Sequence, residues 1–181
     1  MRVLILLSLA LLEIPGVARG QAQTPTVPAN PIVTSTRRLQ ESVRGYLMRA
    51  AEETSPEMYA YKPTPAVRSF GEIIGHLATE QYLLCSAALG EKNPDAQEFE
   101  KTATTKAALA QALRQSFTYC DRAYQMPDAQ AGRWQSMERW GDRTPLSLLV
   151  QNIGHNNEHY GNIVTYLRMK GLVPPSSQPA R

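Results

Sequence analysis

The three histidines of the chain are the residues whose type and spacing most clearly suggest chemistry. His155 and His159 are four residues apart, so on a helix they lie on one face, one turn from each other. Two imidazoles at this spacing can bind one metal ion, and His76 from a second helix would complete a three-histidine site. Such a site leaves a coordination position open for a water molecule or a substrate.

Three further polar residues are expected beside these histidines on the same helical faces. Glu80 follows His76 by one turn, so its carboxylate could orient an imidazole or act as a general base. A solvated helix carboxylate is the alternative for Glu80. Asn152 and Asn162 flank the face of His155 and could hydrogen-bond to the ligand histidines or to bound water. We therefore take Glu80 as the candidate catalytic residue and the two asparagines as supporting residues.

The overall composition indicates a soluble globular protein. The chain has 181 residues, of which 43% are hydrophobic and 19% are charged, and its formal net charge is +3. This length is typical of one domain. Nucleic-acid binding is not expected, because the basic residues form no cluster and do not alternate with aromatic residues.

The first 20 residues are expected to be a secretory signal peptide. Arg2 gives a positive start, residues 3–12 are apolar, and small residues around Gly20 and Ala22 offer two cleavage positions. The apolar run is too short to cross a bilayer, which needs about 20 residues; a buried N-terminal helix is the alternative. We expect an exported protein, periplasmic or secreted, with no stable membrane insertion after cleavage and with residues 21–33 as a flexible leader.

Hydrophobic periodicity and helix boundary signals predict an all-α fold. Ser69 and Glu72 form a capping box, Thr144 and Pro145 begin a later helix, and Gly90 ends an earlier one. The predicted helices comprise residues 34–53, residues 69–89, a third segment that begins at 104 or 105 and ends at 124, and residues 144–170. The first has an apolar stripe formed by Leu39, Val43, Tyr46, Leu47 and Ala50. Little or no sheet is expected, and 126–143 are read as an ordered loop over one end of the helices.

These helices predict a four-helix bundle over residues 34–175, followed by a frayed tail at 176–181. The two cysteines help to choose its topology. Cys85 and Cys120 each follow the expected start of a helix by 16 residues, so they lie at one height only if the second and third helices are parallel. A disulfide, which requires Cα atoms within about 7 Å, therefore implies an up-down-down-up bundle with a long connection at 91–103. Two free buried cysteines are the alternative.

Two groups of motifs resemble the DinB/YfiT-like superfamily. The first group comprises residues 61–65 and 69–76; the second comprises residues 155–162, 166–168 and 171–176. The resemblance implies an up-down-down-up four-helix bundle and assigns the metal ligands of the family to His76, His155 and His159. One departure is that many members have arginine directly after the last histidine, whereas this chain has Tyr160.

These observations favour a metal-dependent enzyme that acts on a small molecule. Zn²⁺ is the favoured ion, with Ni, Mn and Fe as the other candidates, and activation of a water molecule would suit hydrolysis of a small amide or ester. A metal-dependent thiol S-transferase is an alternative that the resemblance suggests. Two non-enzymatic alternatives are a bundle that only binds metal, with Glu80 as a fourth ligand, and a partner-binding module that has lost the site. A homodimer is a further expectation, because dimers are common for such bundles.

Overall fold

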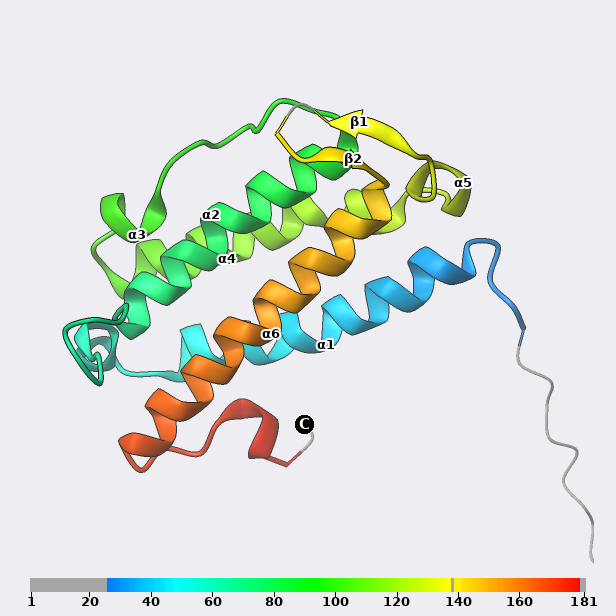
Figure 1. The fold of residues 1–181 in the computed structure, drawn as a ribbon. Helices are drawn as coiled ribbons and strands as arrows, with labels where there is room; N and C mark the ends of the chain where they lie inside the picture. Colours follow the sequence, from blue (N-terminus) through cyan, green and yellow to red (C-terminus); the bar gives the residue numbers. More distant parts are fainter. Residues whose placement is uncertain (1–25, 138, 180–181) are drawn as a thin grey trace, which may run out of the picture.

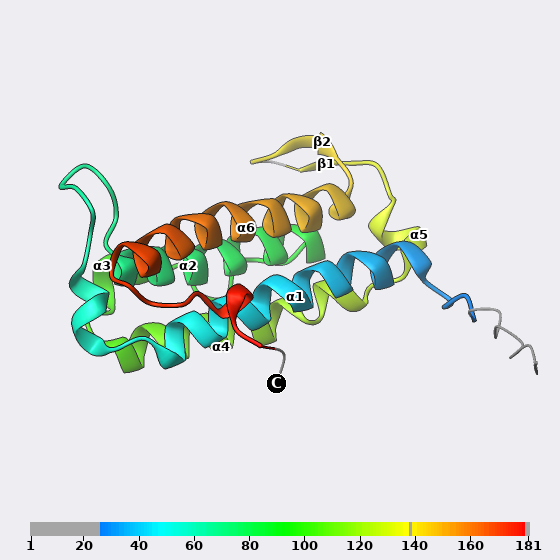
Figure 2. The same ribbon diagram turned by 90° about the horizontal axis from the view of Figure 1, so that it is seen from below.

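The fold is built from four long helices that lie side by side. In the computed structural model these are α1 (Pro31–Glu53), α2 (Phe70–Leu89), α4 (Lys106–Cys120) and α6 (Pro145–Met169). Figures 1 and 2 show that α1 and α6 run in one direction and that α2 and α4 run in the other, which is the up-down-down-up order that the sequence predicts.

The structure describes residues 26–137 and 139–179. The expected signal peptide at 1–20 and the first part of the expected leader, 21–25, lie outside the described residues. Within these two described stretches, no helix combines the length and the apolar character needed to cross a membrane.

Short elements connect the long helices, and the small amount of sheet among them agrees with the expectation of little or no sheet. Two three-residue strands pair antiparallel between α5 and α6, with Ser136 opposite Asp142. This hairpin lies over the end of the bundle where α2 ends and α6 begins (Figure 1). The short elements are η1 (Pro56–Ala60), α3 (Phe99–Thr102), η2 (Ala123–Gln125), α5 (Asp128–Ala131), β1 (Gln135–Met137), β2 (Gly141–Arg143) and η3 (Pro175–Ser177).

The first helix begins three residues earlier than predicted because a distant carboxylate caps it. The backbone amides of Ile32 and Val33 donate to the carboxylate of Asp128, at 3.0 and 2.8 Å. The amide of Asp128 in turn donates to the side chain of Asn30 at 3.0 Å. These bonds satisfy amides that a helix start leaves unpaired, so residues 31–33 are helix and not flexible leader.

Two other boundaries also differ from the prediction. The third predicted helix ends at Cys120, and a 3₁₀ turn over Ala123–Gln125 replaces its last residues. Part of the expected frayed tail is anchored, because the amide of Ser176 donates to the hydroxyl of Tyr160 at 2.8 Å.

The starts of the two helices that carry the histidines are capped as predicted. Ser69 accepts a hydrogen bond from the amide of Glu72 at 3.2 Å, and the Glu72 carboxylate accepts from the Ser69 amide at 2.5 Å. The side chain of Thr144 accepts from the amide of Ser147 at 3.2 Å, and Pro145 occupies the first helical position. These caps fix where α2 and α6 begin, and therefore which residues face each other across the bundle.

The core lies between the four helices and is cross-linked at one end. Cys85 of α2 and Cys120 of α4 form a disulfide with a Cα–Cα distance of 5.3 Å, which confirms the predicted pairing. Leu39 is an exception to the predicted apolar stripe of α1, because it is 62% exposed. The largest side chains that are almost fully buried include Leu47, Phe70, Leu77, Leu84, Leu113, Phe117, Leu148 and Ile163.

A chain of buried amide side chains crosses this core from α1 to α2 and α6. Asn156 of α6 donates to Gln40 of α1 at 3.2 Å and to Asn152 at 2.8 Å, and it accepts from Gln81 of α2 at 3.2 Å. Asn152 donates to Gln81 at 2.7 Å and also lies 3.3 Å from the sulfur of Cys85. We refer to Gln40, Gln81, Asn152 and Asn156 as the amide network.

Candidate metal centre

The structure brings the three histidines together between α2 and α6, as the sequence predicts. His76 comes from α2, and His155 and His159 come from successive turns of α6. The Nε2 atom of His155 lies 3.1 Å from the Nε2 atoms of both His76 and His159. All three candidate ligand atoms lie within 4.8 Å of one another, as a group that could hold a metal ion requires.

The donor set fits a divalent cation better than it fits hydrogen bonds among the rings. The Nε2 atom of His155 has either one lone pair or one proton, so it cannot satisfy both neighbouring nitrogens. Its other ring nitrogen, Nδ1, is buried and has no partner among the described residues. A cation at the meeting point of the rings would accept a lone pair from each of the three Nε2 atoms, and three imidazoles are a known ligand set for zinc.

Burial keeps the imidazoles in the neutral form that metal binding needs. It lowers the pKa of His76 to about 4, with the nearby charge of Arg68 as a smaller cause. Burial also lowers the pKa of His155 to about 3, and the two neighbouring histidines lower it further. The pKa of His159 is lowered by burial as well. Protons therefore compete weakly for these nitrogens near neutral pH.

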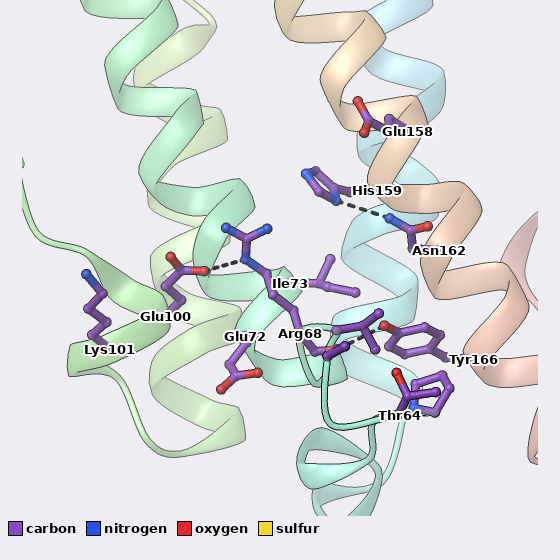
Figure 3. A pocket seen from close by; sticks show the side chains of 13 residues that line it. Thr64, Arg68, Glu72, Ile73, Glu100, Lys101, Glu158, His159, Asn162 and Tyr166 are labelled. Carbon is purple, nitrogen blue, oxygen red and sulfur yellow. Dashed lines mark hydrogen bonds and ion pairs between the residues drawn. The ribbon is translucent and has the colours of Figure 1, made fainter.

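Asn162 lies beside His159, and its supporting role stays a prediction. Its amide nitrogen lies 3.4 Å from Nδ1 of His159 (Figure 3). The nitrogen and oxygen of an asparagine amide are exchangeable assignments. A His159 that offers the lone pair of Nε2 would carry its proton on Nδ1 and donate it to the amide oxygen.

Asn152 does not take the supporting role that the sequence suggests. Its amide nitrogen donates into the amide network, and its oxygen accepts from Asn156. Its side chain therefore serves the core between α2 and α6. Helical spacing alone does not separate the two asparagines, because both are within one turn of a histidine.

Glu100 is the carboxylate nearest His76 in the described structure, and the sequence gives little sign of it. Its Oε2 atom lies 3.9 Å from Nδ1 of His76 and 2.7 Å from Nε of Arg68. Glu100 belongs to α3, inside the segment that the sequence suggests is only a polar connection. The one sequence signal for this contact is Gly75, which lets α3 pass close to α2. A Cβ at that position would lie 2.6 Å from the backbone nitrogen of Glu100.

Glu80, the candidate catalytic residue from the sequence, is half-buried one turn after His76 in α2. It lines a pocket of about 510 Å³ together with His76 and Arg139. Burial raises the pKa of its carboxyl group, and Glu100 contributes to the rise, whereas Arg139 and Arg68 oppose it. No hydrogen bond joins Glu80 to a histidine in the described part of the chain, so its role stays a prediction.

A larger pocket opens on the side of His159. It has a volume of about 760 Å³, and its walls include Arg68, Glu100, Asn162 and Tyr166 (Figure 3). Arg68 and Glu100 line both pockets, so the histidine cluster can be approached from two sides of this ion pair.

Tyr160, where many family members have arginine, faces away from the pockets. Its ring stacks on Tyr46 of α1 with a centroid distance of 5.2 Å, and its hydroxyl holds Ser176. The residue therefore connects α6 to α1 and to the C-terminal segment.

Comparison with known proteins agrees with this architecture. Residues 40–163 match the model of the DinB superfamily. None of the curated proteins that were compared with the chain matches it significantly.

Solved structures with the same fold come from several bacteria. A DinB-like protein from Bacillus cereus ATCC 10987 has a TM-score of 0.68 and 15% identity, and the alignment covers 78% of this chain and 95% of that one. A DinB-like protein from Bacillus subtilis has a TM-score of 0.60 and 26% identity, and the alignment covers 83% of this chain and 100% of that one. A protein assigned to the DinB family from Exiguobacterium sibiricum 255-15 has a TM-score of 0.59 and 21% identity, and the alignment covers 80% of this chain and 95% of that one. Since the matched residues make up more than half of the sequence, the chain belongs to the DinB superfamily.

Proposed function

We propose that the protein is a metal-dependent enzyme that hydrolyses a small amide or ester, with Zn²⁺ as the favoured ion. The observation that carries this proposal is the meeting of three Nε2 atoms beside a pocket of about 760 Å³. Three neutral ligands leave coordination positions free, whereas a purely structural zinc site normally has four protein ligands. The pocket gives a small molecule access to that position.

The side chains around the histidines support this chemistry. When bound, a divalent cation would supply Lewis acidity that polarises a carbonyl group and lowers the pKa of a water molecule. The side-chain amide of Asn162 lies 3.4 Å from Nδ1 of His159, and Oε2 of Glu100 lies 3.9 Å from Nδ1 of His76. Such outer partners fix the tautomer and the direction of a ligand imidazole.

Glu80 is our candidate for the proton acceptor. Its carboxylate shares a pocket with His76, and burial raises its pKa. A raised pKa brings a carboxylate closer to the range in which it can take a proton from a water molecule and return it to a leaving group. Glu80→Gln should then lower kcat while leaving the metal content unchanged.

We also propose that the protein works outside the cytoplasm. The disulfide between Cys85 and Cys120 supports this, because such bonds form and persist mainly in oxidising compartments. The substrate would accordingly be a small molecule that is present in the periplasm or the medium.

The test compares the original protein with His155→Ala for metal content and for hydrolysis of small esters and amides. Asn157→Ala, on the exposed face of the same helix, is the matched control. We expect the original protein and the control to bind one equivalent of metal and His155→Ala to lose it together with activity. Equal metal content in all three would refute the metal site. Metal bound without hydrolysis would refute the enzyme proposal, and turnover of thiol conjugates alone would favour the transferase alternative.

A further inference from the structure

Arg68 is held from two sides at the edge of both pockets. Its backbone oxygen accepts a hydrogen bond from the hydroxyl of Tyr166 at 2.9 Å, and its Nε atom donates to Glu100 at 2.7 Å. Arg68 also directly precedes Ser69, the cap of α2. These contacts hold the backbone of Arg68 and the Nε atom of its long side chain.

The remaining donors of this guanidinium are free and face the site. Figure 3 shows its two terminal nitrogens directed into the space between Glu100 and His159. Neither terminal nitrogen has a hydrogen-bond partner in the described residues, and the side chain is 43% exposed. An arginine that is fixed through Nε and open at its terminal nitrogens presents the paired donors that a planar anion requires.

The other charges around the larger pocket are mostly compensated. Lys101 forms an ion pair with Glu98, and Glu72 accepts from Lys62 and from its own helix cap. Glu158 lies on the far side of His159 from Arg68 (Figure 3). The donors of Arg68 are therefore the main unsatisfied charged group between Glu100 and the histidines in the described structure.

We propose that Arg68 binds a carboxylate of the substrate, so that the enzyme acts on small molecules that carry a carboxylate next to the amide or ester bond. This inference rests on the proposed function, because it names the substrate class of the same site. A monoanion suits the position better than a phosphate dianion, since Glu100 and Glu158 line the same pocket and would repel a second negative charge.

The test measures binding of three ligands. These are N-acetylglycine, which has both a carboxylate and an amide, the neutral N-acetylglycinamide, and methyl phosphate. Zinc-loaded original protein, Arg68→Met, Arg68→Lys and Lys101→Met are titrated and followed by NMR chemical shifts. Lys101→Met is the matched control, because it removes a positive charge from the same pocket. Each sample is also measured for zinc content, thermal stability and hydrolysis of a neutral ester.

We expect Arg68→Met to weaken binding of N-acetylglycine by about tenfold or more, as for the loss of a charge-assisted hydrogen bond. The affinity of Arg68→Lys for N-acetylglycine should lie between those of the original protein and Arg68→Met, because lysine keeps the charge and loses the planar pair of donors. Lys101→Met should change this affinity by less than about twofold, and N-acetylglycinamide should bind all variants alike.

Three results would overturn the inference: no binding of N-acetylglycine to the original protein, equal binding to Arg68→Met, or tighter binding of methyl phosphate. Equal binding to Arg68→Met would mean that the carboxylate contacts the metal alone. If zinc content and ester hydrolysis persist in such a case, the proposed function stands and only the substrate class is wrong.

Discussion

Replacing Gly75 by alanine tests how the structure places Glu100 beside the histidines. Gly75 directly precedes His76 in α2, and α3 passes over it. A Cβ at Gly75 would lie 2.6 and 2.7 Å from the backbone nitrogen and Cα of Glu100 and 2.8 Å from the carbonyl carbon of Phe99. Ordinary contacts begin at 3.4 Å, so α3 must move away by about 0.8 Å.

Two opposing effects set the size of the change in stability. Overpacking of this kind costs about 1–3 kcal/mol of unfolding free energy, and alanine in a helix interior recovers about 1 kcal/mol relative to glycine. We therefore expect Gly75→Ala to be destabilised by about 0–2 kcal/mol. Glu100 would move with α3, so Arg68 would lose its 2.7 Å partner. We expect weaker zinc binding and weaker N-acetylglycine binding as well.

The assay is urea unfolding of metal-free protein, together with zinc and N-acetylglycine titrations. Gly45→Ala in α1 is the matched control, because a Cβ there would have no described atom within 4 Å apart from its chain neighbours and the backbone of its own helix. This control should gain about 0.5–1 kcal/mol and should leave both affinities unchanged. An equal gain in stability for both variants, with unchanged affinities, would refute the proposed packing of α3 on α2.

Three other predictions concern stability. Reduction of the bond between Cys85 and Cys120, which are 35 residues apart, should lower the unfolding free energy by about 3–4 kcal/mol; equal melting with and without reductant would contradict this. Asp128→Ala should destabilise the protein by about 1–2 kcal/mol, because the first amides of α1 lose their acceptor; hydrogen exchange should be faster at these amides, and unchanged exchange would contradict the capping. Metal-free protein should lose stability as pH falls from about 6.5 toward 4. The pKa values of His76 and His155 are lowered to about 4 and 3, so over this range the unfolded chain binds protons that the folded chain does not. An unfolding free energy in urea that stays constant over this range would contradict the burial of the rings.

The sequence predicts the long helices and the histidine cluster because both depend on local rules. Capping residues such as Ser69 and Thr144 act within one turn of their helix. The pairing of His155 with His159 follows from helix geometry, and only the placement of His76 needs the fold. Parallel α2 and α4 could be anticipated because a disulfide imposes a distance that few topologies satisfy.

The remaining features depend on contacts between residues that are distant in the chain. Glu100 reaches His76 through a short helix in a polar segment, and no periodicity marks a helix of four residues. The early start of α1 depends on Asp128, which follows it by more than 90 residues. Leu39 fits the apolar period of α1, but no described residue covers it fully and it stays 62% exposed.

The amide network has a consequence for how α6 is oriented. Apolar side chains tolerate small rotations of a helix, because one methyl group can replace another in a contact. Paired amides do not tolerate such a rotation. Turning α6 by one residue, about 100°, would separate Asn152 and Asn156 from Gln81. Each buried donor left without a partner would then cost about 1–3 kcal/mol. We infer that these hydrogen bonds select the single rotational setting of α6 in which its imidazoles point toward α2. A variant with leucines in place of the four amides could thus form a stable bundle in which the histidines of α6 no longer point toward α2.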